Sequence, residues 1–204
     1  MKAKSNKQLK GIVKKDSHIK GRSIIIAPEL FWEYSLNIYK DEKVKDACLF
    51  LQDHAGLNVN LILLLTYLSE QQLILSFEDL EGIETALERS EKLLKHHRRK
   101  RKGLKKINQV AYKQALADEL DLERGQQQEL LEAANGCFFN RIQSPLQLSD
   151  FLTALCINKR TKSPYYDPDN AELTLPKSLL DACTELAKVA ENRFFDQQNK
   201  TNKP

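Results

Sequence analysis

Nine lysine and arginine side chains lie between residues 92 and 106, and no acidic residue interrupts them. Cations packed this densely repel one another unless an anion lies nearby. The phosphates of nucleic acid are the commonest anion of this kind, and they bind lysine and arginine with little regard to base sequence. The segment therefore predicts a polyanion-binding site made of Lys92, Lys95, Arg98, Arg99, Lys100, Arg101, Lys102, Lys105 and Lys106.

Two other interpretations of this basic segment stay open. It can be a solvated helix end, since cations complement a helix C-terminus and the acidic residues of 78–91 neutralise part of the charge. It can also rest on a membrane surface, which is disfavoured because aromatic and aliphatic residues are missing between the charges. The same shortage of aromatic residues argues against base stacking, so contact with nucleic acid would be electrostatic.

Charge is segregated along the chain, although the net charge is only +4. Residues 1–27 carry eight basic residues and one acid, and residues 28–91 carry four basic residues and thirteen acids. Two basic regions thus flank an acidic one, and residues 1–22 could add phosphate contacts. Such asymmetry points to an anionic partner or to an acidic or helical protein partner.

A second group of polar residues surrounds Gly56 within an apolar stretch, namely Gln52, Asp53, Asn58 and Asn60. One interpretation is structural: these side chains cap helix ends, and Asn58 is a good N-cap. The other is a small polar pocket, lined by Trp32, Glu33, Tyr34, Asp53 and Asn60.

Catalytic and metal-binding motifs are missing from the sequence. It has no glycine-rich phosphate loop and no nucleophile elbow. His96 and His97 are adjacent rather than four residues apart, which is the helical spacing that binds one metal. Cys137 has no histidine close in sequence. The sequence therefore predicts a non-enzymatic protein with no cofactor and no metal.

The stretch from Phe31 to Leu68 carries a recognisable pattern: Trp-x-aromatic-Ser-Leu, then Ala-Cys-Leu-x-Leu-Gln-Asp, then Gly-x-x-Val-Asn. It resembles an uncharacterised proteobacterial family, a helical domain of unknown function. Glu42-Lys43 replaces an expected Pro-Gly, and Asn58 an expected Asp. The resemblance implies an all-helical soluble protein and brings no known activity. The matching residues are Trp32, Tyr34, Ser35, Leu36, Tyr39, Ala47, Cys48, Leu49, Leu51, Gln52, Asp53, Gly56, Val59 and Asn60.

Apolar periodicity predicts an all-α fold, a compact bundle of about seven helices without any sheet. The fourth and fifth helices form a long antiparallel hairpin with a basic tip, broken near Gly103. The expected organisation is a basic disordered arm (1–27), a single helical domain (28–198) and a disordered tail (199–204). Within the domain, 28–75 is a three-helix core block, 76–135 the hairpin and 144–198 the C-terminal helices.

The third helix, apolar nearly all round from Leu61 to Leu68, should be the central buried one. Trp32, Leu51, Leu61, Leu64 and Leu65 are expected to be buried. This apolar run is too short to span a bilayer. The four cysteines form no Cys-x-x-Cys pair and no signal peptide is visible, so reduced thiols and a cytoplasmic location are expected.

Two functional hypotheses follow. In the first, the chain is a helical binding module that docks on RNA, DNA or a ribonucleoprotein through the hairpin tip and the basic arm, with no membrane partner. In the second, it is a protein–protein adaptor whose hairpin binds an acidic or helical partner, without nucleic acid.

Overall fold

The structure is a computed structural model that describes residues 24–163 and 174–201. Residues 1–23 of the basic arm predicted over residues 1–27 lie outside the described residues. The elements are α2 (Pro28–Ile38), α3 (Glu42–Ala55), α4 (Val59–Glu70), β1 (Leu73–Ile74), α5 (Phe77–Leu104), α6 (Gln109–Ala134), β2 (Asn140–Arg141), α7 (Gln147–Thr161) and α8 (Lys177–Thr201).

The all-α class is confirmed, with seven helices among the described residues. The expected absence of any sheet was wrong, because β1 and β2 pair antiparallel, with Leu73 opposite Arg141 and Ile74 opposite Asn140. The pair arises where the chain leaves α4 through Gln72, whose φ is +55°. Leu73 and Ile74 are buried, and buried backbone groups need hydrogen-bond partners, which the neighbouring segment supplies.

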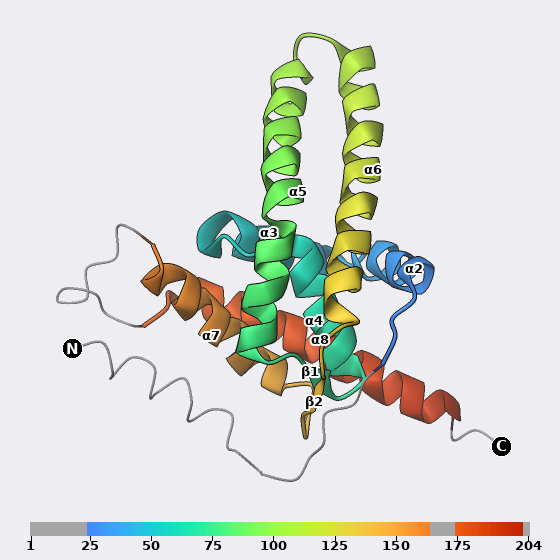
Figure 1. The fold of residues 1–204 in the computed structure, drawn as a ribbon, viewed down its shortest axis with the longest axis vertical. Helices are drawn as coiled ribbons and strands as arrows, with labels where there is room; N and C mark the ends of the chain where they lie inside the picture. The colour runs from blue at the N-terminus through green and yellow to red at the C-terminus, as the bar shows by residue number, and fades with distance from the viewer. Residues whose placement is uncertain (1–23, 164–173, 202–204) are drawn as a thin grey trace.

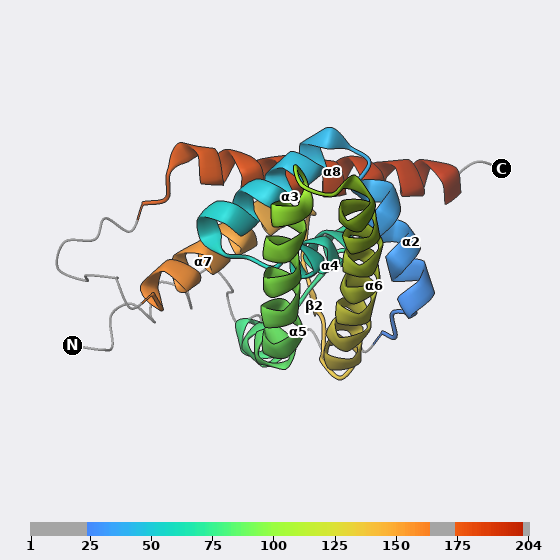
Figure 2. The same ribbon diagram turned by 90° about the horizontal axis from the view of Figure 1, so that it is seen from above.

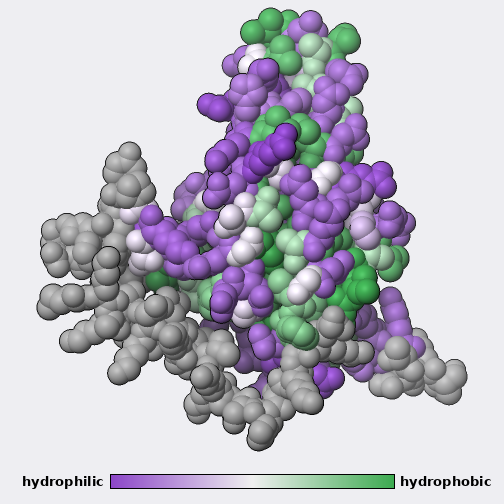
Figure 3. All heavy atoms as spheres, viewed as in Figure 1, coloured by the Kyte–Doolittle hydropathy of each residue, from purple (hydrophilic) through white to green (hydrophobic). Residues whose placement is uncertain are grey.

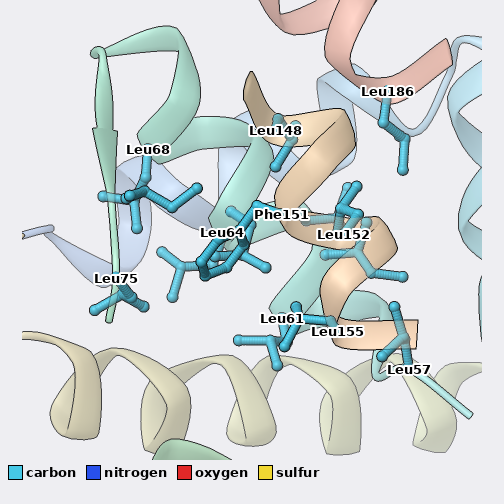
Figure 4. Close-up of a cluster of buried hydrophobic side chains, with 14 of the residues drawn as sticks. Leu57, Leu61, Leu64, Leu68, Leu75, Leu148, Phe151, Leu152, Leu155 and Leu186 are labelled. Atoms are coloured by element: carbon cyan, nitrogen blue, oxygen red, sulfur yellow. The ribbon is translucent and has the colours of Figure 1, made fainter. Parts of the chain in front are cut away.

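The central position of α4 is confirmed. Ten of its twelve residues are buried, and Leu61, Leu64 and Leu65 are each at most 1% exposed. Figure 4 shows leucines of α4 beside side chains of α7 and α8. Each fully buried leucine contributes about 1.5–3 kcal/mol relative to an exposed one. We call α2, α3, α4, α7 and α8 the body of the protein. The apolar sequence of α4 supplies the centre of its core, to which Leu51 of α3 also belongs, as predicted.

The hairpin of α5 and α6 stands out from the body. Figure 1 shows these two helices rising side by side from the layer formed by the other helices, with their connection at the far end. Seen along the hairpin in Figure 2, α8 runs along one edge of the body, and α3 crosses in front of it. The predicted long antiparallel hairpin is therefore present, and its connecting turn is the part farthest from the core.

The helix ends around Gly56 follow the predicted capping chemistry. Gly56 has a φ of +68°, a conformation that glycine adopts without steric cost. The Asn58 side chain accepts a hydrogen bond from the Leu61 amide at 3.1 Å. Asp41 and Ser76 cap α3 and α5 in the same way. These contacts satisfy amides that a helix start leaves unpaired.

Three predicted boundaries were wrong. Residues 24–27 do not belong to a disordered arm, because Ile26 is 3% exposed and its amide donates to the Asn135 side chain at 2.9 Å. Residues 199–201 do not belong to a disordered tail either, since α8 continues to Thr201. The hairpin turn lies after Leu104 rather than at Gly103, because Asn108 caps α6 through the Ala111 amide.

Burial of the tryptophan was also predicted wrongly. Trp32 is only partly buried, whereas the preceding Phe31 is 0% exposed. Phe31 packs with Tyr34 and Tyr67, and the ring centroids of these three residues lie 4.9–6.2 Å apart. Adjacent helix positions differ by about 100°, so only one of the two neighbouring rings can face the core.

Candidate functional site

The basic segment lies on the distal part of α5, where the hairpin loses its apolar interior. Leu94 is fully buried, and it is the last buried residue of α5. Beyond it, α5 turns His97, Arg98 and Arg101 toward α6, and His97 Nε2 lies 2.8 Å from the Ala115 carbonyl oxygen. In the distal part of the hairpin, α5 and α6 are therefore held together by polar contacts.

Two of the predicted anion-binding arginines are occupied inside the hairpin. Arg98 lies 3.3 Å from Glu119 and 2.8 Å from Glu123, and Arg101 binds Glu119 as well. Burial lowers the pKa of Arg98, but the hydrogen bond and charge of Glu123 outweigh it and raise the pKa overall. Both side chains are about four-fifths covered, with 21% and 17% exposed. Arg98 and Arg101 thus join α5 to α6, and their guanidinium groups are already paired with carboxylates of the hairpin.

Two of the predicted lysines pair with glutamates one turn earlier on the same helix. Lys92 lies 3.3 Å from Glu88, and Lys95 lies 3.4 Å from Glu91. All but Glu91 are well exposed, so these pairs contribute only about 0.3–0.5 kcal/mol each. Both lysines remain able to exchange their partner for a phosphate.

The other five predicted residues form the free part of the site, which we call the basic tip: Arg99, Lys100, Lys102, Lys105 and Lys106. Each is exposed. Within residues 24–163 and 174–201, no carboxylate lies within 4.0 Å of their charged nitrogens. The set of cations without a carboxylate partner is thus smaller than the predicted site, because two arginines close the hairpin and two lysines pair along α5.

Two aliphatic side chains beside the basic tip are almost fully exposed. Ile107 and Val110 have exposed fractions of 83% and 81%. Ile107 lies in the turn before α6 and Val110 in the first turn of that helix, at the far end of the hairpin. Figure 3 shows hydrophobic atoms at this end, next to hydrophilic ones.

Two of the polar residues around Gly56, Asn58 and Asn60, join the body to the hairpin. Asn58 Nδ2 donates to Gln126 Oε1 at 3.0 Å and also binds Glu91. Asn60 donates to the same Gln126 oxygen at 2.9 Å and accepts from Gln127 at 3.0 Å. Asn58 therefore both caps α4 and bonds to the hairpin, whereas Asn60 only bonds to the hairpin. Sequence reasoning missed the two glutamines, and their successive positions in a polar stretch of α6 gave no signal.

The five residues of the predicted polar pocket do not come together. Glu33 and Asp53 are exposed, and Asn60 is held by the two glutamines of α6. The remaining two residues lie on different faces of α2. Tyr34 contacts Glu70 of α4, whereas Trp32 contacts Arg124 of α6.

Tyr34 belongs to a buried ionic cluster. Its hydroxyl donates to Glu70 at 2.6 Å, and Arg193 donates to the same carboxylate at 2.8 Å. Burial raises the pKa of Glu70, although the bonds from Tyr34 and Arg193 act in the opposite direction. Burial, reinforced by the charge of Glu70, holds the pKa of Tyr34 well above its usual value. This arrangement ties α2 and α4 to α8.

Trp32 lies at a shallow depression lined by Pro28, Glu29, Trp32, Arg124, Gln127 and Gln128. The Arg124 guanidinium sits 5.7 Å from the centre of the indole ring, within range of a cation–π contact. The depression has room for about one water molecule. It is too small for an organic ligand.

Metal-binding clusters and membrane-spanning helices are both missing from the described part of the chain. Among residues 24–163 and 174–201, no three histidine, cysteine or acidic side chains are grouped so as to hold a metal ion. No helix in these two ranges combines the length and the apolar composition needed to cross a bilayer.

Comparison with known proteins finds a family model that matches part of the chain. Residues 30–130 match the family described as "Protein of unknown function (DUF2390)", a range that runs from α2 through most of α6. The match fits the resemblance to an uncharacterised family and includes the basic tip. No curated protein and no solved structure matches the chain.

Proposed function

We propose that the protein is a non-enzymatic helical binding module that docks on RNA, DNA or a ribonucleoprotein through the basic tip. One observation carries the proposal: five exposed cations without a carboxylate partner among the described residues stand at the end of a projecting hairpin. A solvated helix end is a poorer explanation, because the nearby acids are already paired with Arg98, Arg101, Lys92 and Lys95.

The N-terminal arm supports the proposal by charge alone. Residues 1–22 carry eight lysine and arginine residues and one acid. Phosphate contacts need no defined fold, so such an arm can add to the affinity of the basic tip. A cytoplasmic location is also part of the proposal and rests on the four free cysteines.

A titration at several salt concentrations tests the proposal. Labelled single-stranded and duplex RNA and DNA are titrated with the full chain, and the affinity is plotted against salt. If all five cations of the basic tip contact phosphates, the logarithmic slope is about −3.5 to −4.5. Weak sequence preference is expected, because phosphate contacts carry no base information.

Charge reversal identifies the surface that binds. The variant Arg99→Glu, Lys100→Glu, Lys102→Glu spares Arg98 and Arg101, which hold the hairpin closed. A matched control, Lys40→Glu, Lys177→Glu, Lys188→Glu, makes the same change in net charge on exposed residues of the body. The tip variant should lose binding and the control should keep most of it. Equal affinity of the two variants, or no binding at low salt, contradicts the proposal.

The adaptor hypothesis is the second candidate, and the exposed aliphatic residues along the hairpin favour it. Leu93, Leu116 and Leu120 are 41–51% exposed. Aliphatic side chains along a helix can serve as anchors for a partner helix. If nucleic acid does not bind, cross-linking from these positions in cells should capture a discrete protein partner.

A further inference from the structure

Resting on the proposed function, we propose that the hairpin tip selects unpaired nucleotides. In this arrangement Ile107 and Val110 pack against the faces of unstacked bases, while the cations of the basic tip hold the phosphates on either side. The proposal names a substrate class, single-stranded segments or loops, within the polyanions considered above.

The first support is the unusual exposure of the two aliphatic side chains. Ile107 and Val110 are 83% and 81% exposed, more than any other large hydrophobic residue described except Ile25. They lie three positions apart where the chain enters α6. Both side chains are almost fully exposed to water. Burying them against a partner would contribute about 25 cal/mol of binding free energy per Å² of apolar surface removed from water.

The second support is the order of charged and apolar residues. Lys105 and Lys106 precede Ile107, and Lys113 follows Val110 by three positions, with all three lysines exposed. The apolar pair is therefore bounded by cations along the chain. A complementary partner must offer apolar surface next to anions.

Paired and unpaired nucleic acids differ in this respect. A duplex exposes phosphates but keeps its base faces stacked, so only the cations would gain from contact with it. An unpaired segment exposes base faces beside the phosphates, and proteins usually bind these faces with aromatic rings or arginine planes. The tip lacks exposed aromatic rings, so its contact with base faces would be burial of aliphatic surface rather than ring stacking. The combined surface at the tip therefore matches unpaired nucleotides better than a duplex.

An anionic lipid surface offers the same two chemical features but fits less well. Segments that lie in a membrane interface carry several large apolar residues, usually with aromatic ones. No exposed residue from Arg99 to Lys113 is aromatic, and the one ring in this range, Tyr112, is partly buried beside Arg101. Vesicle binding is therefore included as an outcome of the test.

The test compares a stem-loop RNA with a duplex of the same stem sequence that lacks the loop. The variant Ile107→Ser, Val110→Ser removes the aliphatic groups and keeps every charge. The control Ile25→Ser, Leu30→Ser alters exposed aliphatic residues of the body, 86% and 62% exposed. Fluorescence anisotropy is measured at two salt concentrations, and circular dichroism verifies folding.

The wild type should bind the stem-loop more tightly than the duplex. The tip variant should lose about tenfold in affinity for the stem-loop, because two aliphatic contacts are removed, and almost none for the duplex. Its salt slope should be unchanged, since the cations remain. The body control should behave as the wild type.

Three results would overturn the inference. The first is equal wild-type affinity for stem-loop and duplex, and the second is an unaffected stem-loop affinity in the tip variant. In both, loss of binding by charge reversal alone would leave the proposed function intact. The third is tighter binding to phosphatidylserine vesicles than to RNA, with loss in the tip variant. If no nucleic acid binds, the proposed function itself fails.

Discussion

The helix α4 and the distal hairpin are built from opposite kinds of contact. In α4, leucines with almost no exposed surface hold the body together. In the distal hairpin, Arg98 and Arg101 close on Glu119 and Glu123, and aliphatic residues point outward. Apolar burial in the body depends little on ionic strength, because it involves no charges. The ion pairs that join α5 and α6 weaken as salt screens their charges.

The largest expected effect is on the body. Leu64→Ala should lower the free energy of unfolding by about 2–5 kcal/mol, because it leaves a cavity in a fully buried site. The matched hairpin variant Leu116→Ala, at a residue 41% exposed, should cost far less, about 0.5 kcal/mol. Urea unfolding of both variants measures the contrast. Similar costs would show that the hairpin shares the core of the body.

The next effect is on closure of the hairpin. Glu119→Ala should cost about 1–3 kcal/mol, since it leaves Arg98 and Arg101 partly covered and short of a carboxylate. The loss should be local. Hydrogen exchange of the α6 amides near residues 109–119 should accelerate while exchange in α4 stays slow. Uniform acceleration throughout would mean that the two regions unfold together.

Substitutions of Asn58 should lower the free energy of unfolding, because this residue joins the body to the hairpin. Asn58→Ala should cost about 1–2 kcal/mol, because it removes the cap of α4 and the bond to Gln126. Asn58→Asp keeps an acceptor for the cap but loses the donor and places a carboxylate beside Glu91, so it should cost at least as much. Urea unfolding compares the two variants. Wild-type stability of the aspartate variant would assign the whole effect to capping.

The smallest effect is a pH dependence within the body. The pKa of Glu70 is raised by burial, so the folded protein keeps this proton to a higher pH than the unfolded chain. The free energy of unfolding should therefore fall as pH rises from about 4.3 through the raised value. Glu70→Gln cannot titrate and should lack this fall. Urea unfolding at pH 4 and pH 7 checks it, and parallel profiles would contradict it.

The body could be predicted from sequence to the level of individual caps. Asn58 takes the expected role as the cap of α4, and Asp41, Gly56 and Ser76 likewise begin or end helices through chemistry that depends on a few neighbouring residues. The choice between Phe31 and Trp32 for the core failed, because it depends on the position of α4 and not on the local pattern.

The hairpin was less predictable, because its side chains contact residues that are distant in the sequence. Nothing within the basic segment distinguishes Arg98 and Arg101, which meet acids about twenty positions later, from Arg99 and Lys100, which face solvent. The exposure of Ile107 likewise depends on where the helix starts, because α6 begins only at Gln109 and leaves Ile107 in the turn.

The length of α5 has an electrostatic consequence. Ten residues separate Leu94 from the end of the helix at Leu104, a rise of about 15 Å at 1.5 Å per residue. The Debye length at physiological ionic strength is about 8 Å. Residues 28–91 carry thirteen acids against four basic residues, and much of that negative field is screened before it reaches the end of α5. The hairpin thus acts as a spacer that weakens the influence of the acidic residues of the body on the cations at its end.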